Sequence, residues 1–424
     1  MWFRRDLRLV DHPALVEACS RGAVLPLFVV DPRFDRAGGA RRALLAHLLA
    51  VLNVDLGGAL VIRLGDPTEV VPEVADSVDA RRVYVSRDFT PYGRDRDRKV
   101  AAALQSRGRV LRGVGSPYAV EPGTVLKDNG EPYSIFTPFF RRWQGHQQPG
   151  CLDSPVSPDL LEAASDVAHR RPVDSVEVAE ARWNVFRHDG LDRYRSAREF
   201  PAQDGTSRLS SMIKFGAVHP SRLLADLDLS RDDHRVFASE LAWRDFYADV
   251  LLREPRSAWT NLDRRFDRLP VETGARARAD FARWCNGTTG FPIVDAGMRQ
   301  LVASGWMHNR VRMITASFLV KDLHLPWQWG ARFFMQHLVD ADLASNNHGW
   351  QWAAGCGTDA APFFRIFNPA AQQERWDPDG EYVRRWIPEL ATDDYPAAML
   401  DHRVERLDAL ARYESVKRLA RLVL

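Results

Sequence analysis

Hydrophobic and polar positions alternate in two ways along the first 120 residues. Short runs rich in β-branched residues have the length of buried strands, and longer stretches carry apolar side chains at helical spacing. The runs lie at residues 23–30, 59–64 and 82–86, and the helical stretches at residues 40–52 and 94–105. Almost no strand residues precede Trp2, so we expect the natural start to lie upstream. Strands that alternate with helices form parallel sheets, which predicts an α/β domain with a doubly wound parallel sheet over residues 1–120.

Beyond residue 120 the pattern changes twice. Clusters of Pro, Ser and Asp replace any clear period over residues 121–189, which predicts a linker between domains. Over residues 190–424, Trp, Phe, Leu and Arg recur at helical spacing, and eight of the thirteen tryptophans fall between Trp284 and Trp386. This half is predicted to form an all-α domain.

Composition fits an ordinary globular protein of two domains, because 45% of the 424 residues are hydrophobic and 27% are charged. Charged residues interrupt every apolar run, so no membrane segment is expected. The four cysteines form no CxxC pair, which implies neither a zinc site nor a disulfide framework and favours the reducing cytoplasm. We expect no bound metal. Since the net charge is only +2, a nucleic-acid surface requires positive charge sorted onto one face.

The most unusual polar cluster is the segment 340–352, which contains two aspartates, two asparagines and two tryptophans. Buried carboxylates and amides need partners, and an indole beside them favours a flat aromatic ligand. The chain has neither a GxGxxG turn after a strand nor a Walker loop, so the commonest phosphate-binding loops are absent. We interpret the segment as one wall of a flavin pocket.

A second candidate is the segment 204–210, which reads Asp-Gly-Thr-Ser-Arg-Leu-Ser before an apolar stretch. Its hydroxyls, backbone N–H groups and guanidinium suit an anion such as a diphosphate. A routine helix N-cap explains the same residues. Both interpretations stay open on sequence grounds.

A third candidate is the helical face formed by Glu240, Trp243, Arg244 and Tyr247, which follow the spacing i, i+3, i+4 and i+7. A core face would be aliphatic, and a solvent-exposed face has little use for Trp. We therefore favour a polar cavity with an aromatic wall over a salt-bridged surface helix.

A fourth candidate is the segment 305–313, in which Asn309, Arg312 and Met313 share one helical face. Arg312 is a candidate partner for Asp340 or Asp342, because buried carboxylates need a cation or a hydrogen-bonded ligand. We interpret His308 as a hydrogen-bonded structural histidine.

The two tryptophans at positions 350 and 352 are two residues apart. On a helix this spacing turns Trp350 and Trp352 toward different surroundings. We expect one ring to face the cofactor and the other to face a substrate cavity.

Ordered motifs along nearly the whole chain resemble those of one family. They are Trp2-Phe-Arg-Arg-Asp-Leu-Arg-Leu, Gly205-Thr-Ser-Arg-Leu-Ser, Glu240-Leu-Ala-Trp-Arg-Asp-Phe-Tyr, Gly290-Phe-Pro-Ile-Val-Asp-Ala-Gly-Met-Arg, Gly305-Trp-Met-His-Asn-Arg, Asn346-Asn-His-Gly-Trp-Gln-Trp and Phe364-Arg-Ile-Phe-Asn-Pro. The chain thus resembles the DNA photolyase/cryptochrome family, and most closely its class I cyclobutane pyrimidine dimer photolyases.

The resemblance implies an N-terminal α/β domain and a C-terminal helical domain that holds FAD in a U-shaped conformation, in a monomer that acts on ultraviolet-damaged DNA. The implied FAD contacts are Tyr194, Thr206, Ser207, Arg208, Leu209, Ser210, Phe237, Arg244, Arg312, Asp340, Ala341, Asp342 and Asn346. Among them, Tyr194 and residues 206–210 would hold the diphosphate, Asp340 and Asp342 the sugar and ring side, and Asn346 the reactive flavin nitrogen. Arg312 would pair with Asp340.

The resemblance also implies the substrate contacts. The implied catalytic residues are Glu240, Trp243, Asn309, Met313 and Trp352, and the implied DNA contacts are Arg198, Glu240, Trp243, Asn309, Arg310 and Gln372. A pyrimidine dimer is badly stacked and weakly paired, so extruding it costs less than flipping a normal base. Excited reduced flavin would donate one electron, the cyclobutane ring would split, and the electron would return. Because arginines would contact phosphates, DNA affinity is expected to fall steeply with salt.

The chain departs from the family pattern at two places. Trp350 and Trp327 match the proximal and middle tryptophans of the photoreduction path, but residues 269–283 contain no distal tryptophan. Either another aromatic residue such as Trp329 completes the path, or photoreduction is slow. His348 stands where glycine is common, as a tolerated variant or as a modest tuner of the flavin environment.

An antenna chromophore is expected in the N-terminal domain. The segment 91–97, with Arg94 near an acidic position of folate-using relatives, resembles segments that hold 8-hydroxy-5-deazaflavin more than those that hold methenyltetrahydrofolate. A structural turn explains Tyr92 and Gly93 equally well.

Two rival functions are a (6-4) photolyase and a cryptochrome-type light sensor that does not repair DNA. The first predicts histidine after His308, where Asn309 stands, and the second usually carries a longer signalling tail. The resemblance therefore favours cyclobutane dimer repair.

Overall fold

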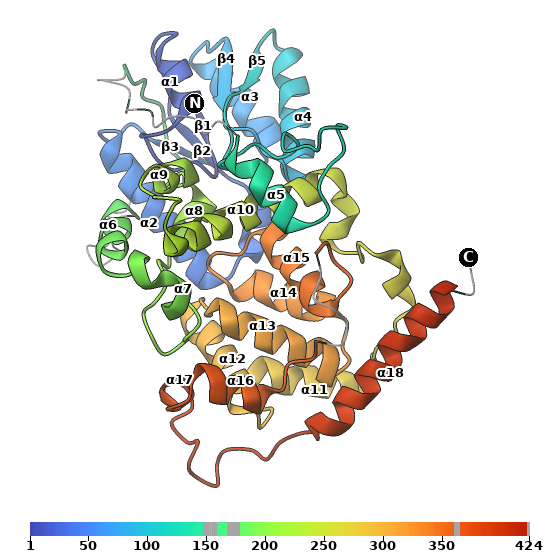
Figure 1. Cartoon of the computed structure of the whole chain (residues 1–424). Helices are drawn as coiled ribbons and strands as arrows, with labels where there is room; N and C mark the ends of the chain where they lie inside the picture. Colours follow the sequence, from blue (N-terminus) through green and yellow to red (C-terminus); the bar gives the residue numbers. More distant parts are fainter. Residues whose placement is uncertain (147–151, 153, 155–158, 168–178, 360–364, 422–424) are drawn as a thin grey trace. The chain divides into compact units, whose positions relative to one another are not determined.

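The computed structural model describes residues 1–146, 152, 154, 159–167, 179–359 and 365–421. It divides into two compact units (Figure 1). The first unit comprises Met1–Tyr133, Thr137–Asp192 and Ser207–Arg253, and the second comprises Ser134–Phe136, Arg193–Thr206 and Glu254–Leu424. The chain therefore crosses between the units several times, whereas the sequence predicted three consecutive segments. Each unit is described by itself.

The first unit is built around short parallel strands. They are β1 (Trp2–Phe3), β2 (Leu27–Val30), β3 (Val61–Leu64), β4 (Arg82–Val85) and β5 (Val110–Gly113). The order β1-β2-β3 forms one parallel sheet and β4-β5 another, and β1 lies beside β4. The order of strands reverses direction between β1 and β4, as in a doubly wound sheet. The predicted α/β fold is confirmed.

Strand β1 has only two residues, which is too short to produce a recognisable period in the sequence. It forms because Trp2 and Phe3 are buried, and because Leu27 N–H donates to the Met1 carbonyl at 2.8 Å. The amino group of Met1 donates to the Leu25 carbonyl at 2.8 Å. Backbone pairing therefore fixes the start of the chain against β2.

The connections between these strands are helical. They are α1 (Pro13–Cys19), η1 (Pro32–Arg36), α2 (Gly39–Asp55), α3 (Pro67–Ser77) and α4 (Pro91–Gln105). The core of this unit consists of side chains from the strands and from α3 and α4, including Leu27, Val61, Val71, Val83 and Val100. Periodicity predicted β2, β3, β4, α2 and most of α4, whereas β1, β5, α1 and α3 were not among the predicted segments.

Helix α4 starts three residues earlier than the sequence predicted. The Thr90 hydroxyl accepts the N–H of Gly93 at 3.0 Å, and Pro91 occupies the first helical position, where a missing N–H costs nothing. The candidate antenna segment 91–97 is therefore the start of a helix and not a loop. Tyr92 and Gly93 thus lie in the first turn of α4, and not in a separate structural turn.

Five more helices and one 3-10 turn of the described residues lie wholly or mainly in the first unit. They are α5 (Phe136–Gln144), α6 (Ala179–Asp189), η2 (Leu191–Arg193), α8 (Ser210–Phe215), α9 (Pro220–Ala225) and α10 (Asp232–Arg253). Helices α5 and α6 lie in the range predicted as a linker, whose clusters at 149–158 and 171–174 fall largely outside the described residues. Buried Asp245 of α10 accepts from the Val120 N–H at 2.9 Å and from Trp143 Nε1 at 3.0 Å. These bonds attach α10 and α5 to the α/β part.

The regular elements of the second unit are helical, as predicted. They are α7 (Tyr194–Ala197), η3 (Pro255–Ala258), η4 (Arg264–Arg268), α11 (Ala275–Asn286), α12 (Pro292–Ser304), α13 (Asn309–Ser317), the π-helix η5 (Phe318–Asp322), α14 (Trp327–His337), α15 (Leu343–Ala354), α16 (Pro369–Trp376), α17 (Glu381–Trp386) and α18 (His402–Arg421). Their core includes Trp284, Phe318, Phe334 and Trp350. Helix α15 packs against both α13 and α14, and these helices with their connections carry most of the candidate residues of this unit.

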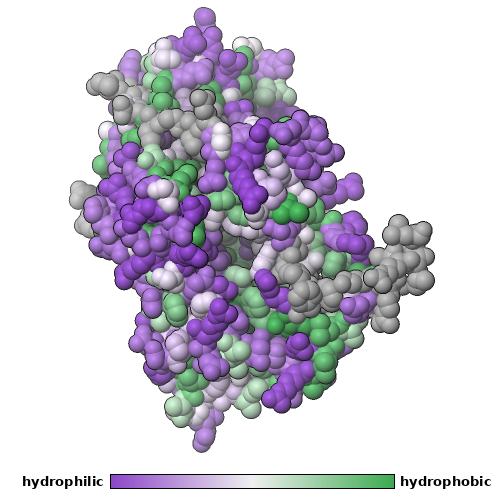
Figure 2. Space-filling view, viewed as in Figure 1, coloured by the Kyte–Doolittle hydropathy of each residue, from purple (hydrophilic) through white to green (hydrophobic). Residues whose placement is uncertain are grey.

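Polar residues dominate the visible surface. On the face drawn in Figure 2, hydrophilic residues predominate and hydrophobic residues form small separate patches. Among the described helices, none combines the length and the apolar character needed to cross a bilayer.

Candidate functional site

The two aspartates of the segment 340–352, Asp340 and Asp342, have different partners. Arg312 of α13 donates from Nη2 to Asp340 Oδ2 at 2.9 Å, and its Nε donates to the Met307 carbonyl at 2.8 Å. Asp342 instead caps α15, because one of its oxygens accepts the N–H groups of Ala344 and Ser345. The sequence left Arg312 two possible partners, and the structure selects Asp340.

One carboxylate oxygen of Asp340 is not used in the ion pair with Arg312. Its Oδ1 is buried, and no described residue donates a hydrogen bond to it. A buried acceptor without a donor costs about 1–3 kcal/mol, and more when it carries charge. This oxygen therefore calls for a ligand hydroxyl or N–H, which fits the donors that a ribityl chain or flavin ring presents.

One face of α15 is shaped for a flat group. Asn346 and Gly349 are three residues apart and share that face. A Cβ added to Gly349 would project into open space, so packing does not require glycine there. Glycine inside a helix costs up to about 1 kcal/mol relative to alanine. Close approach of a planar ligand to the helix backbone would explain why glycine occupies this position despite its lower helix stability.

The amide of Asn346 is held in one orientation. Its Nδ2 donates to the Ala331 carbonyl of α14 at 3.1 Å and to Asn347 Oδ1 at 2.8 Å. Since both protons of the amide are used, its carbonyl oxygen is the group available to a ligand. This orientation suits an N–H donor on a reduced flavin. Neighbouring Ala341 is buried and contributes backbone only.

His348 is a buried, neutral imidazole on α15. Its Nδ1 lies 2.8 Å from the Ala344 carbonyl and its Nε2 lies 2.9 Å from Ser257 Oγ. Because a carbonyl only accepts, Nδ1 carries the proton of the neutral ring. Desolvation by burial lowers the pKa of His348 to about 4. The residue thus ties α15 to η3 and is a structural histidine at a position where glycine was expected.

Acid is expected to destabilise the protein through His348. Its pKa is about 4 in the folded state and near 6.5 when unfolded, so the unfolded chain binds more protons between these pH values. The contribution is intact above pH 6.5 and is lost progressively toward pH 4, by up to roughly 3 kcal/mol. A His348→Gln variant should therefore show a shallower fall of melting temperature between pH 7 and pH 4.5 than the parent. Exposed His188→Gln is the control, and equal slopes for parent and His348→Gln would contradict the expectation.

The candidate diphosphate residues come from both units. In the second unit, Tyr194 begins α7 and is buried beneath the Arg198 guanidinium, 5.2 Å from its ring centre. Gly205 passes so close to α7 that a Cβ would lie 2.4 Å from the Ala197 carbonyl oxygen. Only glycine allows this close approach. It brings the backbone beside half-buried Thr206 close to α7 in space.

In the first unit, residues 207–210 lead into α8. Ser207 accepts from Arg182 Nε at its carbonyl, at 2.8 Å, and its hydroxyl accepts the Leu209 N–H at 3.4 Å. Arg208 has a φ of 51°, an uncommon conformation for a residue with a side chain. Leu209 is buried and Ser210 is exposed. No side chain caps α8 at its N-cap residue Leu209, so the N-cap interpretation is not confirmed, and the Ser207 hydroxyl makes only a local turn.

Helix α10 carries four of the predicted contacts. Half-buried Glu240 and Trp243 lie on one face, and the Trp243 ring lies 5.2 Å from that of Tyr247. Arg244 donates to the Pro117 carbonyl at 2.8 Å and stacks 4.3 Å from the Tyr118 ring centre. Phe237 is buried in an aromatic cluster with residues of α6. The predicted polar and aromatic face thus exists, while Phe237 and Arg244 have structural contacts within the first unit.

The candidate substrate residues of the second unit lie on two helices. Asn309 and Met313 meet on α13, where Asn309 Nδ2 is 3.9 Å from Met313 Sδ. Trp352 of α15 is half-buried, whereas Trp350 is only 2% exposed. The two indoles therefore have different surroundings, as their spacing predicted. His308 caps α13 by accepting the Arg310 N–H at 3.2 Å, which confirms its structural role.

Two of the three remaining DNA candidates contact Trp376, which the sequence did not indicate, and the third, Arg198, lies beside Glu199. Arg310 stacks 4.6 Å from the Trp376 ring centre, and Gln372 Oε1 accepts from Trp376 Nε1 at 3.2 Å. Glu199 accepts from Arg310 and lies 3.8 Å from Arg198 Nε. Two guanidiniums, those of Arg310 and Arg375, thus stack on the Trp376 ring, and Glu199 neutralises part of their charge. Only the Arg-Trp-Asp sequence 375–377 at the end of α16 could have indicated this stacking.

The tryptophans around Trp350 form a chain of aromatic contacts. The Trp350 ring lies 6.1 Å from that of Trp284, which stacks 5.7 Å from Phe281. Phe281 in turn lies 5.3 Å from half-exposed Trp329. Buried Trp327 donates to Asn261 Oδ1 at 2.8 Å. Trp284 directly follows the range 269–283. The sequence did not predict its contact with Trp350, because the two residues are distant in sequence.

The candidate antenna segment holds a stack of cations and rings. The Arg33 and Arg96 guanidiniums lie 4.6 Å and 5.5 Å from the Tyr92 ring centre, and Arg96 lies 5.1 Å from that of Trp2. The Tyr92 hydroxyl bonds to Asp31. Arg94 is exposed on α4. These contacts explain the segment structurally, and the choice between deazaflavin and folate stays a prediction.

Comparison with known proteins covers the whole site. Residues 1–159 match the family model described as DNA photolyase, and residues 237–393 match the model described as the FAD binding domain of DNA photolyase. A Synechococcus protein named deoxyribodipyrimidine photo-lyase is 36% identical over 98% of this chain and 96% of its own length.

Solved structures give the same result. A bacterial class III photolyase from Agrobacterium tumefaciens superposes with a TM-score of 0.87 at 34% identity, covering 98% of this chain and 97% of its own. An archaeal photolyase from Sulfolobus tokodaii with two FAD molecules superposes with a TM-score of 0.85 at 27% identity, covering 98% and 99%. The similarity extends through the segments that contain Asp340, Asn346 and Trp350.

Proposed function

Because this chain belongs to the DNA photolyase family, we propose that it is a deoxyribodipyrimidine photolyase, which uses light to split cyclobutane pyrimidine dimers in DNA. The name of the Synechococcus relative supports this activity, and the FAD-binding match supports FAD as its cofactor. Membership of class I is the finer part of the proposal, and it rests on the sequence motifs around Glu240 and Asn309. A cytoplasmic monomer with a deazaflavin-type antenna belongs to the same proposal.

One observation carries the cofactor assignment. Arg312 pairs with one oxygen of Asp340, and the other oxygen is buried with no donor among the residues that the structure describes. Two hydrogen-bond acceptors, the Asp340 carboxylate before α15 and the side-chain carbonyl of Asn346 on α15, fit the hydroxyl and N–H groups of FAD. When bound in its reduced form, FAD supplies one electron on excitation and takes it back after the ring has opened.

The residues of the chain then bind and orient the lesion. Photolyases extrude the damaged bases from the helix, and a dimer is cheaper to extrude than a normal base pair. Trp243 and Trp352 would provide aromatic surfaces against the flipped dimer, which also exclude water. The Glu240 carboxyl group, in its protonated form, would donate a hydrogen bond to a dimer carbonyl, where negative charge appears when the dimer gains an electron.

Arginines around Trp376 would hold the DNA strand. Arg310 is paired with Glu199 in the protein alone, so a phosphate competes with that carboxylate for the guanidinium. Arg198 and Gln372 lie in the same cluster and would contact the backbone beside the lesion. Phosphate contacts position the strand without selecting its sequence, which suits an enzyme that must find a lesion anywhere.

The proposal is tested by removing the hydrogen bond from Glu240. A Glu240→Ala variant is expected to split a defined thymine dimer oligonucleotide with a quantum yield lowered roughly threefold to tenfold, with a smaller loss of affinity, because the lost bond strengthens only as charge develops. Repair is measured per absorbed photon with chemically reduced protein. Asp232→Ala on the same helix is the control.

The same assay separates the rival functions. Repair of an oligonucleotide that contains a (6-4) photoproduct instead would support a (6-4) photolyase, and flavin photochemistry without repair of either lesion would support a light sensor. Either outcome would overturn the proposal. An unchanged yield in Glu240→Ala would remove only the role of that carboxyl group.

A further inference from the structure

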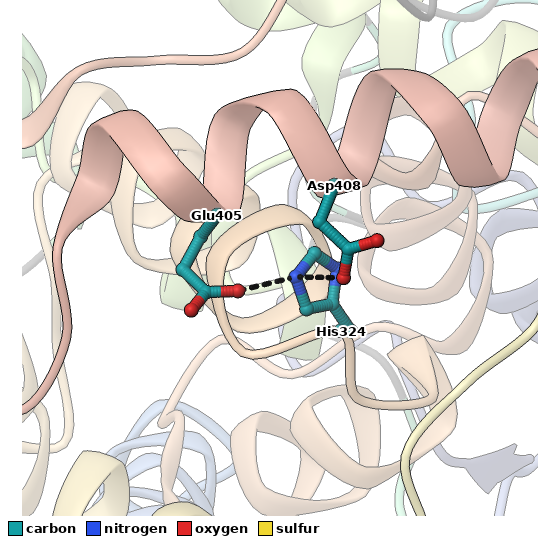
Figure 3. A group of neighbouring side chains, drawn as sticks. All are labelled: His324, Glu405 and Asp408. Carbon is teal, nitrogen blue, oxygen red and sulfur yellow. Dashed lines mark hydrogen bonds and ion pairs between the residues drawn. The ribbon is translucent and has the colours of Figure 1, made fainter.

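We propose that His324, Glu405 and Asp408 form a binding site for a divalent cation of the zinc type in the second unit (Figure 3). His324 follows η5, and the two carboxylates lie on α18. The group lies apart from the segments that carry the FAD and DNA candidates. The sequence predicted no metal, since it offers no cysteine pair and since His324 and Glu405 are 81 residues apart.

The three donors converge on one point. His324 Nε2 lies 2.8 Å from Glu405 Oε2 and 3.4 Å from Asp408 Oδ2, and all three ligand atoms lie within 4.8 Å of one another. Figure 3 shows the imidazole between both carboxylates. Glu405 and Asp408 are three residues apart, so both project from the same face of α18. Tetrahedral zinc with bonds of about 2.0–2.2 Å needs ligand atoms about 3.4 Å apart, so small side-chain rotations complete the set.

Hydrogen bonding alone cannot satisfy both carboxylate oxygens at His324 Nε2. A single imidazole nitrogen carries at most one proton, whereas two carboxylate oxygens face it. A cation in place of that proton would contact all three atoms at once. Nitrogen and carboxylate oxygen are both ligands that zinc accepts.

Burial leaves room for a fourth ligand on one side. The His324 side chain is only 7% exposed, whereas those of Glu405 and Asp408 are 27% and 43% exposed. The imidazole is therefore fixed by packing, and the carboxylates face solvent, from which a water molecule could complete the coordination.

The surrounding charges favour a cation. Glu272, Glu405 and Asp408 are negative, and Arg412 is the cation that pairs with two of them. Because three carboxylates face one guanidinium, the group keeps an excess of negative charge. The nearby carboxylate of Asp322 is paired with His402 at 2.5 Å.

Groups behind the donors hold them in place. Arg412 Nε donates to Asp408 Oδ2 at 2.9 Å, and its Nη2 donates to Glu272 Oε1 at 2.7 Å. The Glu272 N–H donates to the His324 carbonyl at 2.9 Å. Outer partners that orient ligands in this way are usual at metal sites.

A bound cation would fasten the last helix to the unit. Helix α18 already has the His402–Asp322 contact and a hydrogen bond from the Tyr413 hydroxyl to the Ala354 carbonyl at 2.7 Å. Residues of α18 also line a cavity of about 260 Å³ beside Trp327. The metal would thus fix the wall of that cavity and add stability by binding only the folded state.

The test uses the full chain after removal of metals with a chelator. Titration with Zn²⁺ is expected to show one saturable site and a rise of several degrees in melting temperature. Titration with Co²⁺ is expected to produce the visible absorption of a four-coordinate ion. His324→Ala should abolish both responses, and the nearly isosteric Glu405→Gln and Asp408→Asn should weaken Zn²⁺ binding at least tenfold.

A matched histidine serves as the control. His337→Ala removes a half-buried imidazole on α14 and should leave binding unchanged. The proposal is overturned if the chelated parent binds no Zn²⁺, or if binding persists equally in the folded His324→Ala, Glu405→Gln and Asp408→Asn variants.

Discussion

An Asp340→Ala variant is expected to purify with little or no FAD. The substitution removes a buried acceptor to which no described residue donates, and it removes the Asp340 carboxylate that pairs with Arg312. Breaking a buried ion pair by removing one partner costs about 3–5 kcal/mol. Because Arg312 is 25% exposed, solvent recovers part of that cost. We expect FAD affinity to fall by about 100-fold, which corresponds to the lower end of that range.

The measurement is the ratio of flavin to protein absorbance, followed by titration of the flavin-free protein with FAD. Asp280→Ala is a matched control, because Asp280 pairs with Arg276 on the surface of α11 at 3.8 Å. That variant should retain FAD like the parent. Normal FAD content in folded Asp340→Ala would exclude the carboxylate from the cofactor site, and circular dichroism distinguishes this outcome from misfolding.

A Trp350→Phe variant is expected to lose light-driven reduction of its cofactor while it keeps repair activity after chemical reduction. Trp350 is buried and contacts Trp284 and Phe334, at 6.1 Å and 5.0 Å between ring centres. Its ring also packs where a Cβ of Gly330 would lie, which fixes its position. Phenylalanine is much harder to oxidise than tryptophan, so the first step of electron supply fails while packing is largely kept.

Photoreduction is followed by flavin absorbance under blue light with an external reductant, and repair is measured separately. Two further variants identify the second relay. Loss in Trp327→Phe supports the residue that matches the family position, whereas loss in Trp284→Phe supports the contact path through Phe281 to Trp329. Undiminished photoreduction in Trp350→Phe would show that electrons enter by another route.

Local chemistry was predictable because it depends on residues close together in sequence. The period of apolar residues indicated the parallel sheet and the helical second half, and the spacing of Glu240 and Trp243 placed them on one face. The spacing of Trp350 and Trp352 likewise predicted that the two indoles would have different surroundings. In each case one helix or strand brings the residues together, whatever its surroundings.

Short elements and interrupted patterns were less predictable. Strand β1 consists of two residues that depend on pairing with β2, and α5 lies among Pro, Ser and Asp clusters that hide its period. Their stability comes from tertiary contacts, such as the bond from Trp143 to Asp245. The helix or strand propensity of a short segment does not depend on such distant partners and therefore cannot predict them.

The sequence by itself determined the fold class, the family motifs and the chemical groups available to a flavin and to damaged DNA. Tertiary structure decided which groups meet: Arg312 with Asp340 and not Asp342, Arg310 with Glu199 and Trp376, and His324 with the carboxylates of α18. The physical reason is that hydrogen bonds and ion pairs act over a few ångströms in space, and residues far apart along the chain reach that range only after the helices have packed.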